Sequence, residues 1–203
     1  MSAALQARPA LFIDRDGTII ADAHYPSLAS QVRLIPGAAA AIAHANSTGV
    51  LVIVVTNQSG IARGMITLAQ YESVRDRMNA LLAAAGARVD ATFHCPHWPD
   101  VDGACDCRKP GLGLYRDASA QFDIDLTRSA YIGDRWRDVQ PAVATGGFGV
   151  LVPGVETSES DVEKARTHVS ERLRIAASLG DCFLANLGGK SACSPSVRSI
   201  ATL

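Results

Sequence analysis

The chain has 203 residues, of which 48% are hydrophobic, and 19 Lys and Arg against 20 Asp and Glu give it a net charge of −1. This length is enough for one domain with a sizeable core. The near-zero charge excludes a general attraction to nucleic acid or to an anionic membrane, so any anion must be bound locally. No stretch approaches the roughly 20 uncharged residues that span a bilayer. We therefore expect a soluble, unexported, cytoplasmic protein.

Strands and helices are predicted to alternate along most of the chain. Apolar, mostly β-branched runs predict strands, and apolar residues at steps of three and four predict helices. The expected strands are residues 11–13, 50–55, 89–94, 129–132 and 149–152. The expected helices are residues 38–45, 67–85 with Thr67 as N-cap, 112–122, 139–145 and 159–179. This order is typical of an α/β fold, a Rossmann-like parallel sheet with helices on both faces.

Polar clusters follow three of these strands, at residues 14–18, 56–60 and 133–138. Because the carboxyl ends of parallel strands meet at one edge of a sheet, the clusters are expected to meet there. Asp14 and Asp16 are two residues apart, so in extended chain their side chains lean the same way. Taken alone, this pair fits an aspartate-rich turn as well as a site, but the convergence of the clusters favours a site.

The residue types at this edge suit phosphoryl transfer. A carboxylate can attack phosphorus, and Mg²⁺ bound by carboxylates offsets the repulsion between the two anions. Asp14 is the candidate nucleophile and metal ligand, Asp134 completes the metal site, and Asp16 handles the proton. Thr56 and Lys109 are candidate donors to the phosphoryl oxygens. By themselves, Thr56 would only cap a turn and Lys109 would be solvated.

Three cysteines and a histidine crowd into a segment without periodicity, residues 95–110, which we expect to be a loop. Cys95 and His97 are separated by one residue, as are Cys105 and Cys107, so two such pairs can form a tetrahedron around Zn²⁺. A closed set of these ligands indicates a structural zinc site. The alternatives are three buried free thiols, or His94 as a competing ligand.

These motifs together resemble the haloacid-dehalogenase-like phosphatases, and within them the heptose bisphosphate phosphatases. The resemblance covers about residues 11–152. It rests on Asp14-Arg15-Asp16-Gly17-Thr18, on residues 56–64, on Cys95-Pro96-His97, on residues 105–110, and on Gly133-Asp134 with Asp138 beyond.

The resemblance implies roles for individual residues. Asp14 is the nucleophile and Asp16 the proton donor, with Mg²⁺ held by Asp14, the Asp16 carbonyl and Asp134. Thr56 and Lys109 stabilise the phosphoryl group, and the zinc ligands are Cys95, His97, Cys105 and Cys107. The implied substrate-binding residues are Asp22, His24, Tyr25, Asn57, Gln58, Ser59, Arg63, Arg108 and Arg135.

The implied activity is hydrolysis of the 7-phosphate of D-glycero-D-manno-heptose 1,7-bisphosphate. The metal loop between His97 and Cys105 is short and so resembles that of the histidinol-phosphate phosphatases, which leaves histidinol-phosphate phosphatase as an alternative. Gly111-Leu112-Gly113, where this family more often has a further proline, indicates a different substrate-side edge of the loop. A non-catalytic zinc-binding α/β module is a third. We expect one domain without a large cap at residues 8–180, with its zinc loop at 95–107, and a flexible tail at 181–203. We further expect a monomer whose partner is a small phosphorylated sugar, with no nucleic acid or membrane partner.

Overall fold

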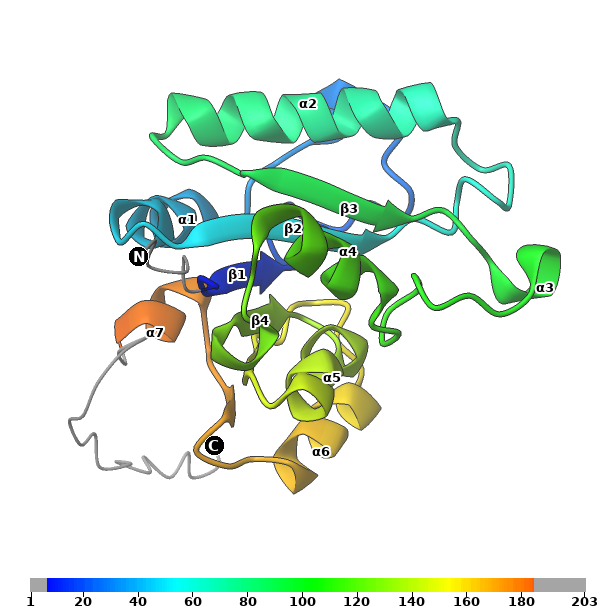
Figure 1. Cartoon of the computed structure of the whole chain (residues 1–203). Coiled ribbons are helices and arrows are strands. Elements are labelled where there is room, and N and C mark those ends of the chain that lie inside the picture. The colour runs from blue at the N-terminus through cyan, green and yellow to red at the C-terminus, as the bar shows by residue number, and fades with distance from the viewer. Residues whose placement is uncertain (1–6, 185–203) are drawn as a thin grey trace, which may run out of the picture.

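A six-stranded parallel sheet forms the centre of the structure, a computed structural model that describes residues 7–184 (Figure 1). The strand order is β3-β2-β1-β4-β5-β6. The strands are β1 (Ala10–Ile13), β2 (Leu51–Asn57), β3 (Ala91–Cys95), β4 (Ala130–Gly133), β5 (Phe148–Leu151) and β6 (Leu173–Ile175). The helices are α1 (Ala38–Ser47), α2 (Leu68–Ala84), α3 (Pro99–Asp102), α4 (Gly113–Phe122), α5 (Trp136–Thr145), α6 (Glu159–Thr167) and α7 (Leu179–Leu184), with 3₁₀ turns η1 (Ala29–Gln31) and η2 (Leu126–Arg128).

Both faces of the sheet are covered by helices, which confirms the predicted α/β fold. Successive side chains of β1 point to opposite faces. Leu11 and Ile13 pack in a core with residues of α1, α2 and α7. Ala10 and Phe12 pack in a second core with residues of α4 and α5. An uninterrupted apolar strand is stable here because neither of its faces meets water.

The sheet reverses its direction of growth at β1, which pairs with β2 on one side and with β4 on the other. In open α/β sheets, ligands bind outside the carboxyl ends of the strands at such a switch point. Asp14 directly follows β1 and Asp134 directly follows β4. The fold therefore places two of the predicted site residues at this switch point.

The start of α2 follows the predicted capping chemistry. The Thr67 side chain accepts a hydrogen bond from the Gln70 amide at 3.2 Å, and the Gln70 side chain accepts one from the Thr67 amide at 2.8 Å. This reciprocal pair satisfies two backbone donors that a helix start otherwise leaves without partners.

The long helix expected at residues 159–179 is wrong, because α6 ends at Thr167 and the chain then forms β6. Val162, Ala165, Val169 and Leu173 do not form the single helical stripe that their spacing predicts, since Leu173 lies on a strand that packs with Val162 and Ala165, and Val169 is exposed. The edge of β5 explains the difference, since β6 pairs with it. Helical periodicity in the sequence contains no information about that open edge.

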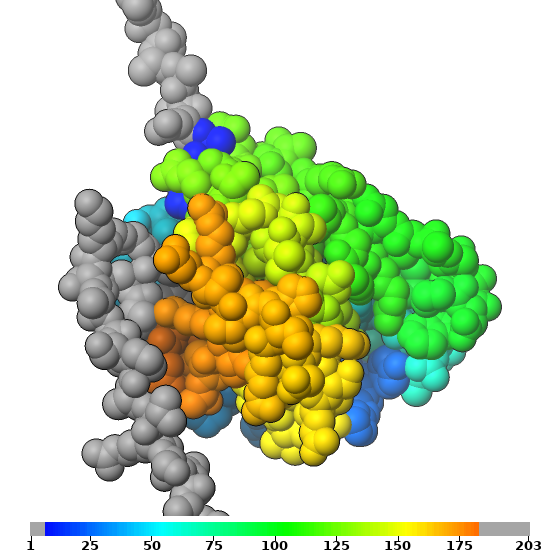
Figure 2. Space-filling model, turned by 90° about the horizontal axis from the view of Figure 1, so that it is seen from below, coloured from blue at the N-terminus to red at the C-terminus, as the bar shows by residue number. Residues whose placement is uncertain are grey.

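On the face shown in Figure 2, residues after about 150 (yellow to orange) form the middle and the green segment with residues 95–110 forms one end.

Three further element boundaries differ from the expectations. The loop at 95–110 contains a one-turn helix, α3, which starts at Pro99. The helix after β4 starts at Trp136, because the Asp138 carboxylate accepts a hydrogen bond from the Arg135 amide at 2.9 Å. Asp181 and Cys182, which we assigned to the tail, lie in α7, and residues 185–203 lie outside the described residues. Among the described helices, none combines the length and apolar character needed to cross a bilayer.

Candidate active site

A cavity of about 310 Å³ lies at the carboxyl ends of β1 and β2. Its walls come from the segments that follow these strands, from the loop that follows β3 and from the start of α5. The residues lining it are Asp14, Arg15, Asp16, Asp22, His24, Tyr25, Pro26, Thr56, Asn57, Gln58, Ser59, Trp98, Arg108, Arg135 and Arg137. Three polar clusters that are far apart in sequence therefore meet at one edge of the sheet, as predicted.

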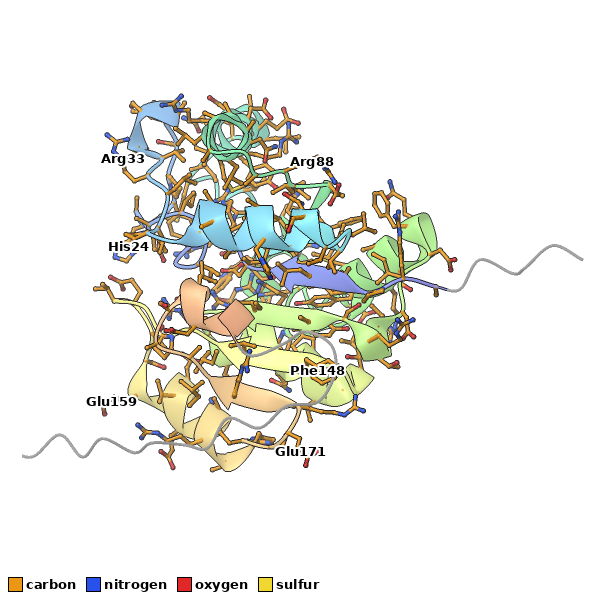
Figure 3. All side chains as sticks on the ribbon, turned by 90° about the vertical axis from the view of Figure 1, so that its left-hand side faces the viewer. His24, Arg33, Arg88, Phe148, Glu159 and Glu171 are labelled. Atoms are coloured by element: carbon orange, nitrogen blue, oxygen red, sulfur yellow. The ribbon has the colours of Figure 1, made fainter. Side chains whose placement is uncertain are left out.

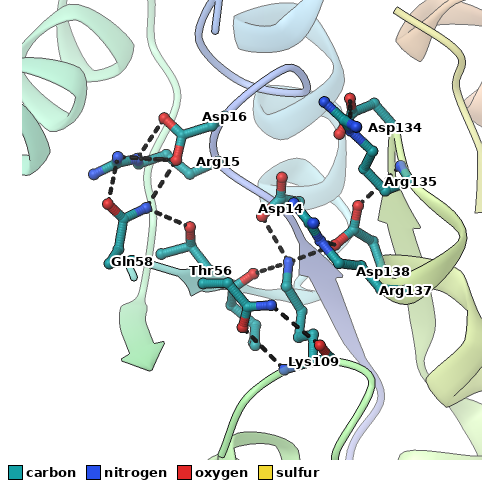
Figure 4. A network of polar contacts seen from close by, with 12 residues as sticks. Asp14, Arg15, Asp16, Thr56, Gln58, Lys109, Asp134, Arg135, Arg137 and Asp138 are labelled. Atoms are coloured by element: carbon teal, nitrogen blue, oxygen red, sulfur yellow. Dashed lines mark hydrogen bonds and ion pairs between the residues drawn. The ribbon is translucent and has the colours of Figure 1, made fainter. Parts of the chain in front are cut away.

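Lys109 is a buried cation between two carboxylates at the floor of this region (Figure 4). Its Nζ lies 2.6 Å from Asp14 Oδ1 and 2.7 Å from Asp138 Oδ1, and it donates to the Val55 carbonyl at 2.6 Å. Burial alone would lower the pKa of Lys109, but the charges of Asp138 and Asp14 outweigh it and raise that pKa. The ammonium therefore stays charged and fixes one oxygen of Asp14, leaving Oδ2 for another partner.

Three buried carboxylates, Asp14, Asp134 and Asp138, have ligand atoms within 4.8 Å of one another. Burial first, and then the charges of Asp14 and Asp138, raise the pKa of Asp134 to about 7. Asp134 Oδ1 is buried without a hydrogen-bond partner among the described residues. A Cβ on Gly17 would stand 2.7 Å from Asp134 Oδ2, so only glycine leaves room there. A hard divalent cation such as Mg²⁺ fits this oxygen cluster, because it would relieve the repulsion that raises the pKa.

Asp16 is held apart from this cluster. Arg15 Nε donates to both of its oxygens at 3.1 Å, and Gln58 Nε2 donates to Oδ2 at 2.8 Å. The same Gln58 amide donates to the Thr56 hydroxyl at 2.8 Å. The expectation that Asp14 and Asp16 lean the same way is wrong, because β1 ends at Ile13 and the chain then turns (Figure 4). Asp14 and Asp16 both line the cavity, but each is held by different hydrogen-bond partners.

Asn57 fixes the main chain of Lys109 to the end of β2. Its Nδ2 donates to the Lys109 carbonyl at 3.1 Å, and its Oδ1 accepts from the Lys109 amide at 2.9 Å. The two cations that follow the last candidate zinc ligand do not lie together. Lys109 is buried and Arg108 lines the cavity, since neighbouring residues on an irregular segment point in different directions.

The predicted zinc residues come together at one point. Cys107 Sγ lies 3.1 Å from Cys95 Sγ, 3.3 Å from Cys105 Sγ and 3.1 Å from His97 Nδ1. All four ligand atoms lie within 4.8 Å of one another. A tetrahedral zinc site with Zn–S near 2.3 Å separates its sulfurs by roughly 3.7 Å, so Zn²⁺ fits this donor set. His94 is not a ligand candidate, because its ring lies 4.4 Å from the Tyr71 ring instead.

Most of the remaining predicted substrate residues line the cavity: Asp22, His24, Tyr25, Asn57, Gln58, Ser59, Arg108 and Arg135. Arg63 does not line it, but its guanidinium donates to the Tyr25 hydroxyl at 2.6 Å. The sequence reasoning gave no role to four cavity residues, Arg15, Pro26, Trp98 and Arg137, or to Asp138 beneath them. Asp138 belongs to the polar cluster after β4, which is the signal that could have found it.

The chain is similar in sequence and in fold to known proteins. A family model described as HAD-hydrolase-like matches residues 106–181. The chain is 39% identical to D-glycero-beta-D-manno-heptose-1,7-bisphosphate 7-phosphatase of Rhodopseudomonas palustris over 170 residues, covering 80% of this chain and 91% of that protein. It is 37% identical to the protein of the same name from Escherichia coli K12 over 171 residues, with 81% and 90% coverage.

Two solved structures share the fold. D,D-heptose 1,7-bisphosphate phosphatase from B. bronchiseptica, complexed with magnesium and phosphate, superposes with a TM-score of 0.74 at 34% identity, covering 86% of this chain and 95% of that one. The phosphatase of the same name from Burkholderia thailandensis has a TM-score of 0.62 at 28% identity, with 88% and 100% coverage. With relatives of this identity matched over nearly their whole length, the chain belongs to the D-glycero-beta-D-manno-heptose-1,7-bisphosphate 7-phosphatase family of HAD-like hydrolases.

Proposed function

We propose that the protein is a magnesium-dependent phosphatase that hydrolyses the 7-phosphate of D-glycero-D-manno-heptose 1,7-bisphosphate. The observation that carries the proposal is Asp14, which lines the cavity while one of its oxygens is held by buried Lys109. The names of its relatives favour this substrate over histidinol phosphate. The paired Asp14 and Lys109 also argue against a non-catalytic zinc module, because burying unused charges is costly.

In the first step, Asp14 Oδ2 attacks phosphorus and the bond between phosphorus and the sugar oxygen breaks. Asp16 gives its proton to the departing alkoxide, so a neutral sugar hydroxyl leaves. Thr56 and Lys109 stabilise the phosphoryl group, whose charge is spread over its equatorial oxygens. Lys109 also holds Asp14 in one orientation, which avoids the cost of ordering the nucleophile during the reaction.

In the second step, the Asp16 carboxylate takes a proton from water, and the resulting oxygen attacks phosphorus. The bond to Asp14 breaks, phosphate leaves, and both carboxyl groups return to their starting states. Arg15 and Gln58 hold Asp16 on the cavity wall, where it can serve both steps. The two aspartates thus have separate tasks, and their separate hydrogen-bond partners support that division.

Two metal ions belong to this proposal. Asp14, the Asp16 carbonyl and Asp134 would hold Mg²⁺, with Asp138 close by, and the ion supplies positive charge that offsets the phosphate and the carboxylates. The relative from B. bronchiseptica was solved with magnesium and phosphate. Cys95, His97, Cys105 and Cys107 would hold Zn²⁺ as a structural ion. Zinc-bound thiolates suit a reducing compartment, which supports the cytoplasm as the place of action.

The sugar would occupy the part of the cavity formed by Asp22, His24, Tyr25, Ser59 and Arg135. The side-chain amides of Asn57 and Gln58 already have partners within the protein, so we assign these two residues to holding Lys109 and Asp16. The proposed partner is a small phosphorylated sugar bound by a monomer.

A phosphate-release assay with the Asp14→Asn variant tests the chemistry. Asparagine has the same shape and still accepts from Lys109, so the fold should survive while Mg²⁺-dependent release falls to background. A panel of heptose 1,7-bisphosphate and histidinol phosphate tests the substrate, with the heptose expected to be preferred. Absence of release from every sugar or amino-alcohol phosphate would overturn the proposal, and preference for histidinol phosphate would overturn its substrate.

A further inference from the structure

Two arginines and two aromatic rings form an alternating stack beside the cavity. The guanidinium carbon of Arg63 lies 5.6 Å from the centre of the Tyr25 ring and 5.1 Å from the centre of the Trp98 ring. On Trp98 a second guanidinium, that of Arg108, lies 5.0 Å from the ring centre. The stack joins three segments, which follow β1, β2 and β3. We define these four residues as the arginine–aromatic stack.

The stack fixes two cations without neutralising them. Within residues 7–184, neither Arg63 nor Arg108 forms an ion pair with a carboxylate, whereas Arg135 lies 3.4 Å from Asp134. Arg108 donates to the His97 carbonyl at 3.3 Å. A ring face holds the plane of a guanidinium but leaves N–H groups at its edge free for an anion. A carboxylate partner would compete with that anion.

Tyr25, at the far end of the stack, is held in a fixed position by its backbone and its contacts. Tyr25 has φ 63°, a conformation that non-glycine residues rarely adopt. Its ring lies against Gly60, where a Cβ would stand 2.5 Å from the ring. Arg63 holds the Tyr25 hydroxyl at 2.6 Å. Tyr25 is therefore held from two sides, and the stack has a fixed end on which Arg63 and Trp98 rest.

We propose that Trp98 is a positioning residue that orients Arg108 for the second anionic group of the substrate. The proposal rests on the proposed function, since a bisphosphate has one phosphate at Asp14 and another anion farther out in the cavity. Trp98, Arg108 and Asp14 line the same cavity. Trp98 thereby makes the site select bisphosphates over monophosphates, although it touches no reacting atom.

Trp98 also has contacts that a purely structural residue would make. Its Nε1 donates to Asp100 at 3.0 Å and its backbone amide donates to Asp102 at 2.8 Å, and both acceptors belong to α3. It also directly follows the candidate zinc ligand His97. A test must therefore separate orientation of Arg108 from support of the loop, and the ratio of kcat/KM for two substrates does so.

The experiment compares heptose 1,7-bisphosphate with heptose 7-phosphate as substrates of the full chain. The quantity measured is kcat/KM for the bisphosphate divided by kcat/KM for the monophosphate. Trp98→Leu keeps apolar bulk but removes the ring face, and should lower this ratio by about threefold to thirtyfold, the range of a cation–π contact. Trp98→Phe keeps a ring face and should retain the ratio to within about twofold of the unsubstituted chain.

The matched control is Phe148→Leu. Phe148 also stacks on an arginine, Arg172, at 5.1 Å, and it stands well apart from His24 of the cavity wall (Figure 3). This variant should leave the ratio unchanged. Zinc content and the melting temperature are measured for every variant. Should Trp98→Leu lose zinc, Arg63→Met removes the stack from its other side, away from the zinc loop, and must lower the ratio instead.

The outcomes separate the two proposals. If the unsubstituted chain releases no phosphate from either substrate, the proposed function fails. If it releases phosphate but Trp98→Leu, with zinc intact, keeps the ratio, the role of Trp98 is overturned and the function stands. An equal loss in Trp98→Leu and Trp98→Phe would also overturn it, because the ring face would then be irrelevant.

Discussion

Lys109 combines two tasks that single residues rarely combine, since it holds Asp14 and also neutralises a buried carboxylate pair. Its Nζ contacts Asp14 and Asp138, and all three side chains are buried. A buried charge that loses its partner is far more costly than an exposed one. The same contacts that we propose for catalysis therefore also determine stability.

Replacement of Lys109 by methionine should lower the free energy of unfolding by about 3–5 kcal/mol, because Asp14 and Asp138 would remain buried without the ammonium that they share. Urea denaturation without added Mg²⁺ measures this. The double variant Lys109→Met with Asp138→Asn is the control. Its decrease in the free energy of unfolding should be smaller than the sum of the decreases in the two single variants. A loss below about 1 kcal/mol, the value typical of exposed pairs, would contradict the prediction.

Asp134 should make Mg²⁺ binding depend on pH. Its pKa of about 7 means that a proton competes with the metal below neutrality. Affinity should therefore be about tenfold weaker at pH 6 than at pH 8, measured by titration calorimetry. The Asp134→Asn variant should bind weakly at both pH values. Equal Mg²⁺ affinity of the unsubstituted chain at pH 6 and pH 8 would show that protons do not compete with Mg²⁺ for Asp134.

The same shift has a consequence for stability. The pKa of Asp134 is raised on folding from 3.8 to about 7, so the metal-free native state keeps a proton that the unfolded chain releases. The contribution of protonated Asp134 to the free energy of unfolding is complete below pH 3.8 and is lost as the pH rises through about 7. Mg²⁺ should restore stability at the upper end of this window, where the carboxylate is free to bind it.

At the scale of elements, the loop between β3 and α4 connects the candidate zinc ligands to Lys109 of the proposed active site. Cys107 lies two residues before Lys109, and Asn57 of β2 holds the Lys109 main chain from the other side. The loop has few apolar residues with which to fold otherwise, so its order should depend on the metal.

Cys107→Ser should reduce zinc below about one per chain and strongly lower phosphate release, while the sheet remains folded. Metal analysis, the assay and circular dichroism measure the three effects. Cys182→Ser is the matched control, because Cys182 is a buried thiol in α7 outside the zinc cluster and should keep zinc and activity. Full zinc content and activity in Cys107→Ser would contradict the structural role of the metal.

Elements were predictable where local chemistry decides them. Thr67 marked the start of α2 as its N-cap, and the β-branched run after Gly49 marked β2. Local chemistry failed for residues 168–179, whose apolar spacing fits a helix although Leu173–Ile175 pair with β5 as strand β6 and α7 begins only at Leu179. An open strand edge is a property of the assembled sheet, and no short window of sequence contains it.

At the scale of the whole molecule, the carboxyl-terminal elements complete the sheet and the core. Leu173 of β6 packs with α5 and α6, and Leu179 of α7 packs with α1. Ending the chain after residue 169 removes both contacts and exposes the edge of β5, which favours aggregation. Ending it after residue 184 keeps them.

The chain ending at residue 169 should therefore lose soluble yield, whereas the chain ending at residue 184 should keep its melting temperature and phosphate release. Expression trials and thermal denaturation of both chains measure this. A stable, active chain ending at residue 169 would show that β6 and α7 add little to the fold. Loss of activity in the chain ending at 184 would contradict the prediction that the residues beyond it belong to a flexible tail.

The sequence by itself determined the fold class, the edge of the sheet that carries the cavity, and the four Cys and His residues of one loop that come together. These follow from strand order and from residue types at short spacings, which are local properties. Only the tertiary structure decided that Asp138 shares Lys109 with Asp14, that Asp16 turns to Arg15 and Gln58, and that Trp98 lies on Arg108. The contacts of Lys109 and Gln58 join segments far apart in the chain, whereas Arg15 and Trp98 contact residues close to them in sequence. In both cases side-chain direction on irregular segments is set by packing that no local pattern encodes.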